Sequence, residues 1–128
     1  MLINTKISGL IITFNEEKNV SEVLKCLHFC DEIIIIDSFS TDKTVQIAKT
    51  FPKVTIVKNK FEDFTKQRNL ALENASNDWV LFLDGDERIT PELEEEILSE
   101  LQKPHQKDAY YFYRKFFFAG KPLNFSGT

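Results

Sequence analysis

The residues best suited to chemistry are the acidic side chains of the tetrapeptide at positions 84–87. Asp84 and Asp86 lie two residues apart, with Gly85 between them and Glu87 after them. Side chains two apart in an extended segment point to the same side. Such a pair of carboxylates supplies the hard oxygen ligands that Mg²⁺ and Mn²⁺ prefer, and it leaves coordination positions for water and phosphate. The tetrapeptide therefore predicts a divalent metal site. The alternative is an acidic turn that only caps a strand.

A metal at this position would favour an anionic ligand. A diphosphate close to two carboxylates is repelled, because like charges about 4 Å apart cost about 4 kcal/mol at an effective dielectric constant of about 20. A divalent cation between them reverses the sign of that interaction. The pair of acids thus predicts a phosphate-bearing ligand that is bridged to the protein by a metal.

Polar residues also follow two other apolar runs. Thr13, Asn15 and Glu16 come after the first run, and Asp37 and Ser38 come after the second. A buried strand that ends in polar groups must provide them with water, hydrogen-bond partners or a metal. We therefore expect these residues to gather with the acidic tetrapeptide at one edge of a sheet.

Two charged residues have an ordinary structural explanation beside a functional one. Arg68 is able to pair bidentately with a phosphate or an aspartate, or it is a solvated charge on a helix. Asp42 is expected to be a first-turn acid of a helix rather than a ligand contact.

The hydrophobic pattern supplies the elements that would position these side chains. The expected strands span residues 7–14, 32–36, 54–57, 79–83 and 110–118. The expected helices begin near residue 15, at residue 40 or 41, at residue 65 and at residue 90. The second of these helices is expected to end at residue 50 and the third at residue 75. Strands that are apolar at nearly every position are buried on both faces. The prediction is an α/β fold with a mostly parallel sheet covered by helices on both faces. Ligands of such sheets bind beyond the carboxyl ends of the strands.

Composition narrows the possible functions. The length of 128 residues predicts one domain. The formal net charge of −4 disfavours a nucleic-acid partner. Cys26 and Cys30 are expected to be reduced. No apolar run is long enough for a membrane helix, and the N-terminus lacks a signal-peptide layout, so a cytoplasmic protein is expected. Neither G-x-G-x-x-G nor G-x-x-x-x-G-K-[ST] is present, which disfavours dinucleotide binding and a P-loop.

Four segments, in this order, resemble family 2 glycosyltransferases of the GT-A fold, and lipopolysaccharide-core glucosyltransferase-like proteins most of all. They are IITFNEE at 11–17, IIIIDSFSTDKT at 33–44, QRNLAL at 67–72 and WVLFLDGDE at 79–87. The resemblance covers about residues 6–125. It implies a nucleotide-sugar donor, usually a UDP-sugar, a Mg²⁺ or Mn²⁺ ion, and inversion at the anomeric carbon.

The resemblance also implies roles for individual residues. The donor-binding residues that it indicates are Thr13, Asn15, Glu16, Asp37, Ser38, Arg68 and Asp84. Of these, Asp37 would contact the uracil or its ribose, and Arg68 would lie near the base or the phosphates. Asp84 would face the ribose and the metal, and Asp86 would be the direct metal ligand. Glu87 is expected to orient Asp86 or the following turn.

Family members typically continue well past this length, so residues 1–128 are expected to be the donor-binding half of a domain. The acceptor half, which would bind a cell-envelope saccharide or a lipid-linked acceptor, and the catalytic base are expected beyond residue 128. The aromatic stretch at 110–118, flanked by Arg114 and Lys115, would suit the inner face of a membrane or a homodimer contact. The alternative is an ordinary strand whose partners lie further along the chain.

Other functional classes fit the sequence less well. A catalytically silent nucleotide-sugar-binding module has the same motifs and differs only in turnover. A sugar-phosphate nucleotidyltransferase would need a glycine-rich basic loop after the first strand, where this chain has TFNEE. A receiver-type signalling domain would need acids directly after the first strand and a phosphorylatable aspartate after the third.

Overall fold

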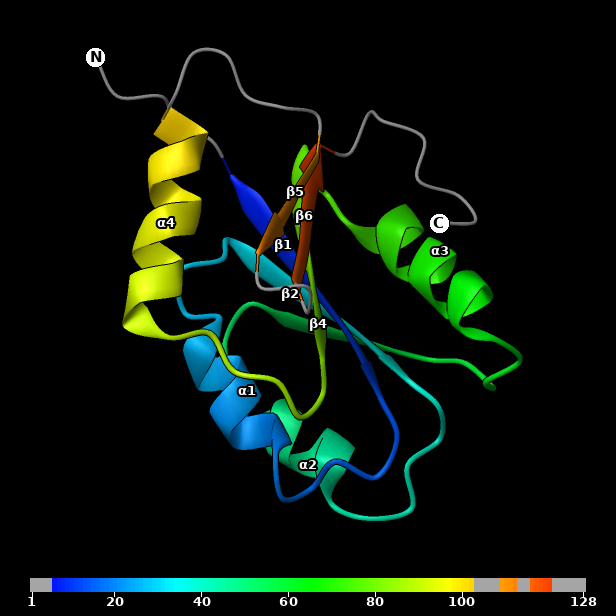
Figure 1. Cartoon of the computed structure of the whole chain (residues 1–128). Coiled ribbons are helices and arrows are strands. Elements are labelled where there is room, and N and C mark those ends of the chain that lie inside the picture. Colours follow the sequence, from blue (N-terminus) through cyan, green and yellow to red (C-terminus); the bar gives the residue numbers. More distant parts are fainter. Residues whose placement is uncertain (1–5, 103–108, 113–115, 121–128) are drawn as a thin grey trace.

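The structure is a computed structural model that describes residues 6–102, 109–112 and 116–120, and its centre is a six-stranded sheet (Figure 1). The strands are β1 (Ile7–Thr13), β2 (Glu32–Asp37), β3 (Val54–Lys58), β4 (Trp79–Asp84), β5 (Ala109–Phe112) and β6 (Phe116–Gly120). Their order is β3-β2-β1-β4-β6-β5. The first four are mutually parallel, whereas β6 runs antiparallel to β4 and β5 antiparallel to β6.

Helices cover both faces of this sheet, as the alternating pattern predicts (Figure 1). They are α1 (Val20–Cys26), α2 (Thr44–Ala48), α3 (Phe64–Asn74) and α4 (Pro91–Gln102). One hydrophobic cluster joins α1, α2 and α4 to the sheet, and a second joins α3 to the opposite face. The four isoleucines of β2 show why the sheet needs both layers. Ile33 and Ile35 belong to the first cluster, and Ile34 and Ile36 belong to the second.

The stretch expected to form one strand at 110–118 is instead two strands. β5 and β6 pair antiparallel, with Tyr111 opposite Phe117. A uniformly aromatic run carries no periodicity that separates one long strand from a hairpin. The side chains of this hairpin lie outside the part of the chain that the structure describes, so the predicted membrane or homodimer contact stays a prediction.

Two helices begin later than predicted, because their expected first residues bond to neighbouring loops. The Ser40 backbone N–H and hydroxyl donate to Asp37, and the Thr41 N–H donates to Asn15 Oδ1. The helix expected from residue 40 or 41 therefore starts at Thr44. The start predicted near Asn15 is displaced to Val20, because Asn15 has a left-handed φ of 51° and its N–H donates to Ser40 Oγ. The N-cap predicted for α4 is present, since Thr90 Oγ1 accepts from the Leu93 N–H.

The two cysteines are unpaired, and one of them is buried. Cys26 and Cys30 are both free thiols. Burial, helped by nearby Asp31, raises the pKa of the Cys30 thiol to about 12, so this thiol stays protonated near neutral pH and is a poor nucleophile. Within the described residues, every helix is too short or too polar to cross a bilayer.

The register of the three central strands brings the predicted polar residues together. Thr13 is paired with Asp37 across β1 and β2, and Ile12 is paired with Asp84 across β1 and β4. The strands are parallel, so their carboxyl ends meet at one edge of the sheet. The loops that follow them therefore surround a common space.

Candidate active site

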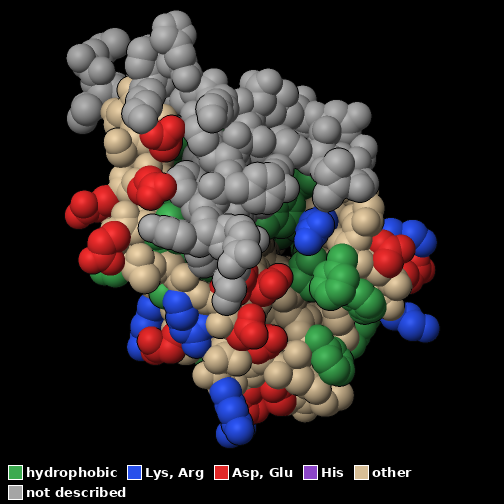
Figure 2. Space-filling model, viewed as in Figure 1, with side chains coloured by type: hydrophobic (Ala, Val, Ile, Leu, Met, Phe, Trp, Pro, Cys, Tyr) green, Lys and Arg blue, Asp and Glu red, His purple; other side chains and the backbone are tan. Residues whose placement is uncertain are grey.

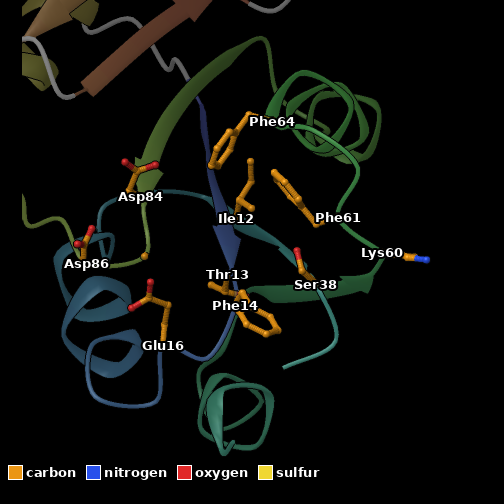
Figure 3. A pocket seen from close by; sticks show the side chains of 11 residues that line it. Ile12, Thr13, Phe14, Glu16, Ser38, Lys60, Phe61, Phe64, Asp84 and Asp86 are labelled. Atoms are coloured by element: carbon orange, nitrogen blue, oxygen red, sulfur yellow. The ribbon is translucent and has the colours of Figure 1, made fainter. Parts of the chain in front are cut away.

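A hollow of about 630 Å³ opens at this carboxyl edge (Figure 3). Its wall comes from the ends of β1, β2 and β4 and from the segment between β3 and α3. The lining residues are Ile12, Thr13, Phe14, Glu16, Ser38, Lys60, Phe61, Phe64, Asp84, Gly85 and Asp86. A volume of this size falls within the range of small-molecule sites in proteins.

The wall of the hollow is chemically divided. The carboxylates of Glu16, Asp84 and Asp86 lie on one side, and the rings of Phe61 and Phe64 lie across from them (Figure 3). The two rings meet edge to face, with centroids 5.0 Å apart. They are also 42% and 59% exposed, which is unusual for large apolar side chains. In the space-filling view, an acidic and a hydrophobic patch flank the opening (Figure 2). The arrangement suits a ligand with a flat ring at one end and a metal-bound anion at the other.

A tight turn after β4 presents the two aspartates. The Asp84 N–H donates to Glu87 Oε1 at 2.8 Å, and the Glu87 N–H donates back to the Asp84 carbonyl at 3.0 Å. The Glu87 carboxylate therefore braces the turn, in line with its expected role. Within the described residues, no three His, Cys, Asp or Glu side chains converge closely enough to form a complete protein cage for a metal. A cation held by Asp84 and Asp86 would need its remaining ligands from water or phosphate.

Glu16 reaches this turn because Gly85 has no side chain. A Cβ placed on Gly85 would lie 2.8 Å from Glu16 Cγ and 3.1 Å from its Cδ. Glu16 is also held from behind, because its N–H donates to Thr44 Oγ1 and its Oε1 accepts from Asn19 Nδ2. Asn19 Oδ1 in turn accepts from Arg88 Nη2. These bonds join the β1–α1 loop to the β4–α4 loop across the acidic side of the hollow.

Replacement of Gly85 by alanine is expected to displace the Glu16 carboxylate. The added methyl group overlaps Glu16 Cγ, and the hydrogen bonds of Glu16 restrict its retreat. We expect a loss of about 1–3 kcal/mol in the free energy of unfolding, measured by urea denaturation. The control is the double variant Glu16→Ala with Gly85→Ala, which removes the overlapping atoms. A loss that persists in full in the double variant would contradict the steric explanation.

Asp37 ends β2 completely buried, and its carboxylate ties two loops together. Its Oδ1 accepts from Thr13 Oγ1 at 2.8 Å and from Ser40 Oγ at 2.6 Å. Its Oδ2 accepts from the Ser40 N–H at 2.8 Å. Asp37 thus stands behind the wall of the hollow rather than in it. Its predicted contact with a nucleobase or ribose stays a prediction.

The loops after β1 and β2 are further joined by Asn15 and Asp42. Asn15 adopts a left-handed conformation (φ 51°), which asparagine tolerates well. Its N–H donates to Ser40 Oγ. Asp42 accepts hydrogen bonds from Thr44 and from the Glu17 N–H. Removal from water acts to raise the pKa of Asp42, but these hydrogen bonds outweigh it and hold that pKa below its usual value. Both side chains therefore fix the loop conformation. The first-turn position predicted for Asp42 is wrong, because α2 begins only at Thr44 and Asp42 lies in the loop before it.

The structure brings together five of the eight predicted site residues. Those lining the hollow are Thr13, Glu16, Ser38, Asp84 and Asp86. Asn15, Asp37 and Arg68 lie outside the lining, with Arg68 on the exposed face of α3. Its predicted phosphate contact stays a prediction.

The aromatic side of the hollow is absent from the sequence prediction. Phe61 and Phe64 stand in the polar stretch NKFEDFTK at 59–66, where large apolar side chains have no core to join. Two phenylalanines in a polar stretch are the sequence feature that could have indicated an aromatic binding surface. Gln67 was also missed as a site residue, and it is a fully buried amide behind Ser38.

A mostly parallel sheet covered by helices on both faces, with two aspartates at the carboxyl end of its central strand β4, is an arrangement shared with glycosyltransferases of the GT-A fold. Residues 8–124 match the family described as glycosyl transferase family 2. The chain belongs to that family, as the four sequence motifs predict.

Curated relatives support this assignment. An uncharacterized glycosyltransferase of Rickettsia typhi is 39% identical over 110 residues, a match that covers 85% of this chain and 37% of the relative. A lipopolysaccharide core biosynthesis glycosyltransferase, LpsC of Rhizobium meliloti, is 31% identical over 105 residues, covering 79% of this chain and 38% of LpsC. The chain therefore spans less than two-fifths of the length of either relative.

Solved structures agree on the fold. Residues 1–349 of S. aureus TarS in complex with UDP-GlcNAc superpose with a TM-score of 0.60 and 30% identity, over 76% of this chain and 31% of that one. Glucosyl-3-phosphoglycerate synthase from Mycobacterium tuberculosis, in a complex with Mn²⁺, UDP and glucosyl-3-phosphoglycerate, gives a TM-score of 0.71 over 93% of this chain and 58% of that one. Its 17% identity makes it a likeness of fold alone.

Proposed function

We propose that this chain binds a UDP-sugar together with a divalent cation, as the donor-binding part of an inverting glycosyltransferase. The observation that carries the proposal is the divided hollow at the carboxyl edge of the sheet. Its acidic side suits a cation and a diphosphate, and its aromatic side suits a nucleobase.

The residues present fit a divalent cation. Asp84 and Asp86 both present carboxylate oxygens on the acidic side of the hollow (Figure 3). Mg²⁺ characteristically takes one or two protein carboxylates and completes its shell with water and substrate phosphates. Within the described residues, the lack of a third converging ligand agrees with that pattern. Mg²⁺ and Mn²⁺ are both compatible with these carboxylate ligands.

The choice of a uridine donor rests on the neighbours. TarS residues 1–349, at 30% identity, form a complex with UDP and a complex with UDP-GlcNAc. The rings of Phe61, Phe64 and Phe14 offer a stacking surface on the side away from the acids. Stacking of a base on an aromatic side chain contributes about 1–3 kcal/mol.

The reaction we propose is a single displacement. An acceptor hydroxyl attacks the anomeric carbon, the bond from that carbon to the diphosphate oxygen breaks, and the configuration inverts. Asp84 and Asp86 would hold the cation, which stabilises the negative charge on the departing diphosphate. The hydroxyl proton passes to a general base. LpsC supports a cell-envelope saccharide or lipid-linked acceptor, and a cytoplasmic reaction at the membrane's inner face stays a prediction.

The proposal predicts metal-dependent stabilisation by UDP. A ligand that binds only the folded state must raise the melting temperature. We expect UDP to raise it when Mn²⁺ is present and to lose most of that effect in EDTA, as measured by thermal denaturation. UMP is the matched control, because it keeps the base but lacks the second phosphate, so its shift should be smaller. No shift by UDP at millimolar concentration with Mn²⁺ would overturn the proposal. Turnover with the complete protein separates the enzyme from a silent binding module.

A further inference from the structure

Gln67 is a buried amide whose hydrogen-bonding groups are all engaged. It is 0% exposed although it lies near the start of an otherwise polar helix. Its Oε1 accepts from Asn59 Nδ2 at 2.8 Å. Its Nε2 donates to Ser38 Oγ at 3.0 Å and to the Asn59 carbonyl at 3.3 Å. A buried polar side chain satisfied on both ends has a fixed orientation, because turning the amide would place like groups against each other.

The orientation of the Gln67 amide determines which hydrogen-bonding group of the Ser38 hydroxyl remains available to a ligand. Asn59 Nδ2 donates both to Gln67 Oε1 and to the Lys60 carbonyl, so the Asn59 amide is itself fixed. Gln67 must therefore present its N–H to Ser38, and the Ser38 oxygen must accept. A serine hydroxyl carries one hydrogen. Among the described residues that hydrogen has no acceptor, and Ser38 lines the hollow. The hydroxyl is thus a hydrogen-bond donor available to a ligand.

The position of Ser38 indicates which part of a ligand it would meet. In Figure 3, Ser38 and Phe61 both lie on the side of the hollow away from Glu16, Asp84 and Asp86. A nucleoside diphosphate whose phosphates approach the acids would extend its base toward Phe61. In a pyrimidine nucleotide, the ring substituent farthest from the sugar is the one at position 4. This substituent is a carbonyl oxygen in uracil and an amino group in cytosine.

We infer that Gln67 is a positioning residue that makes Ser38 a donor to the 4-carbonyl of uracil, and that this pair selects UDP over CDP. The inference rests on the proposed function, since it assumes that the phosphates face the acidic side. With UDP, the Ser38 hydrogen meets an acceptor. With CDP, the Ser38 oxygen can meet the amino group only with its remaining lone pair, and its hydrogen then turns away from the base without an acceptor among the described residues. A preference of about tenfold or more for UDP is expected from one such hydrogen bond.

The test measures the dissociation constants of UDP and CDP by calorimetry in the presence of Mn²⁺. In the parent chain we expect UDP to bind about tenfold more tightly. Ser38→Ala should reduce this ratio to near one. Gln67→Glu should do the same while keeping the hydroxyl, because a carboxylate oxygen would accept the Ser38 hydrogen and turn it away from the hollow. Ser99→Ala, the same chemical change on the exposed face of α4, is the control and should leave the ratio unchanged.

Each outcome bears on a different claim. A UDP preference that survives in Ser38→Ala or in Gln67→Glu overturns the inference, as does equal binding of UDP and CDP by the parent chain. Binding of neither nucleotide by the parent overturns the proposed function, and this inference with it. If Gln67→Glu fails to fold, Asn59→Asp replaces it at a half-buried position. There the new carboxylate would attract Gln67 Nε2, present Gln67 Oε1 to Ser38, and remove the preference in the same way.

Discussion

Replacing Asp86 by alanine is expected to remove the dependence of UDP binding on Mn²⁺. Asp86 is the lining carboxylate that the family resemblance assigns as the direct metal ligand. Loss of residues that only support a metal ligand typically weakens metal affinity by about 10–100-fold, so loss of the ligand itself should weaken it at least as much. Without the cation, the carboxylates of Asp84 and Glu16 would repel the diphosphate. UDP binding should therefore fall by at least about tenfold.

The measurement is calorimetric titration of UDP with Mn²⁺ and again with EDTA. In the parent chain the two titrations should differ strongly, whereas in Asp86→Ala they should coincide. Glu95→Ala is the matched control, because it also removes one carboxylate, but from an exposed position on α4. Its metal dependence should equal that of the parent. Unchanged Mn²⁺-dependent binding in Asp86→Ala would show that the cation is held elsewhere, while UDP binding itself would still support the donor site.

The sheet could be predicted because its strands carry an uncommon pattern. Residues 33–36 are four consecutive isoleucines, and a strand that is apolar on both faces requires helices above and below it. The structure confirms both layers. The hairpin of β5 and β6 could not be separated in the same way, because a run of aromatic residues gives no signal for where a chain reverses. The hydrophobic pattern thus predicts which faces of the sheet are covered by helices better than it predicts where the chain reverses between strands.

The acidic side of the hollow could be predicted and the aromatic side could not. Asp84 and Asp86 are neighbours in sequence, so their spacing alone indicates a shared site. Phe61 and Phe64 face them only because the segment after β3 crosses the edge of the sheet, beyond the ends of β1 and β2. That proximity depends on strand order, which local patterns do not encode.

The loops show a second limit of sequence reasoning. Ser40 and Thr41 are typical N-cap residues, and the pattern predicts a helix directly after them. In the structure their polar groups bond to Asp37 and Asn15 instead. A helix start at this point and the observed loop contacts would each give Ser40 and Thr41 hydrogen-bond partners. Which of the two forms depends on Asp37 and Asn15, and Asn15 comes from a segment distant in the sequence. For Asp37 the sequence predicts a ligand contact, which stays a prediction, whereas its hydrogen bonds to Thr13 and Ser40 depend on a neighbouring strand and loop.

Replacing Asp37 by alanine is expected to destabilise the fold and to weaken nucleotide binding whether or not a metal is present. The carboxylate is 0% exposed and accepts three hydrogen bonds, from Thr13 Oγ1 and from the N–H and Oγ of Ser40. A buried donor left without its partner costs about 1–3 kcal/mol. The hydroxyls can rotate toward other acceptors, but the Ser40 N–H cannot. We expect a loss of about 3 kcal/mol in the free energy of unfolding, measured by urea denaturation.

The effect on binding follows from what these hydrogen bonds hold in place. The loop after β2 carries Ser38 into the hollow, and its link to Asp37 runs through Ser40. If that link is lost, UDP should bind more weakly both with Mn²⁺ and with EDTA, unlike the behaviour expected of Asp86→Ala. Asp37→Asn is the control, because it can keep an oxygen for Thr13 and the Ser40 hydroxyl while placing its NH₂ against the Ser40 N–H. Its loss of stability should be smaller than that of Asp37→Ala. A stability within about 0.5 kcal/mol of the parent for Asp37→Ala, typical of surface substitutions, would show that this carboxylate does not organise the edge of the sheet.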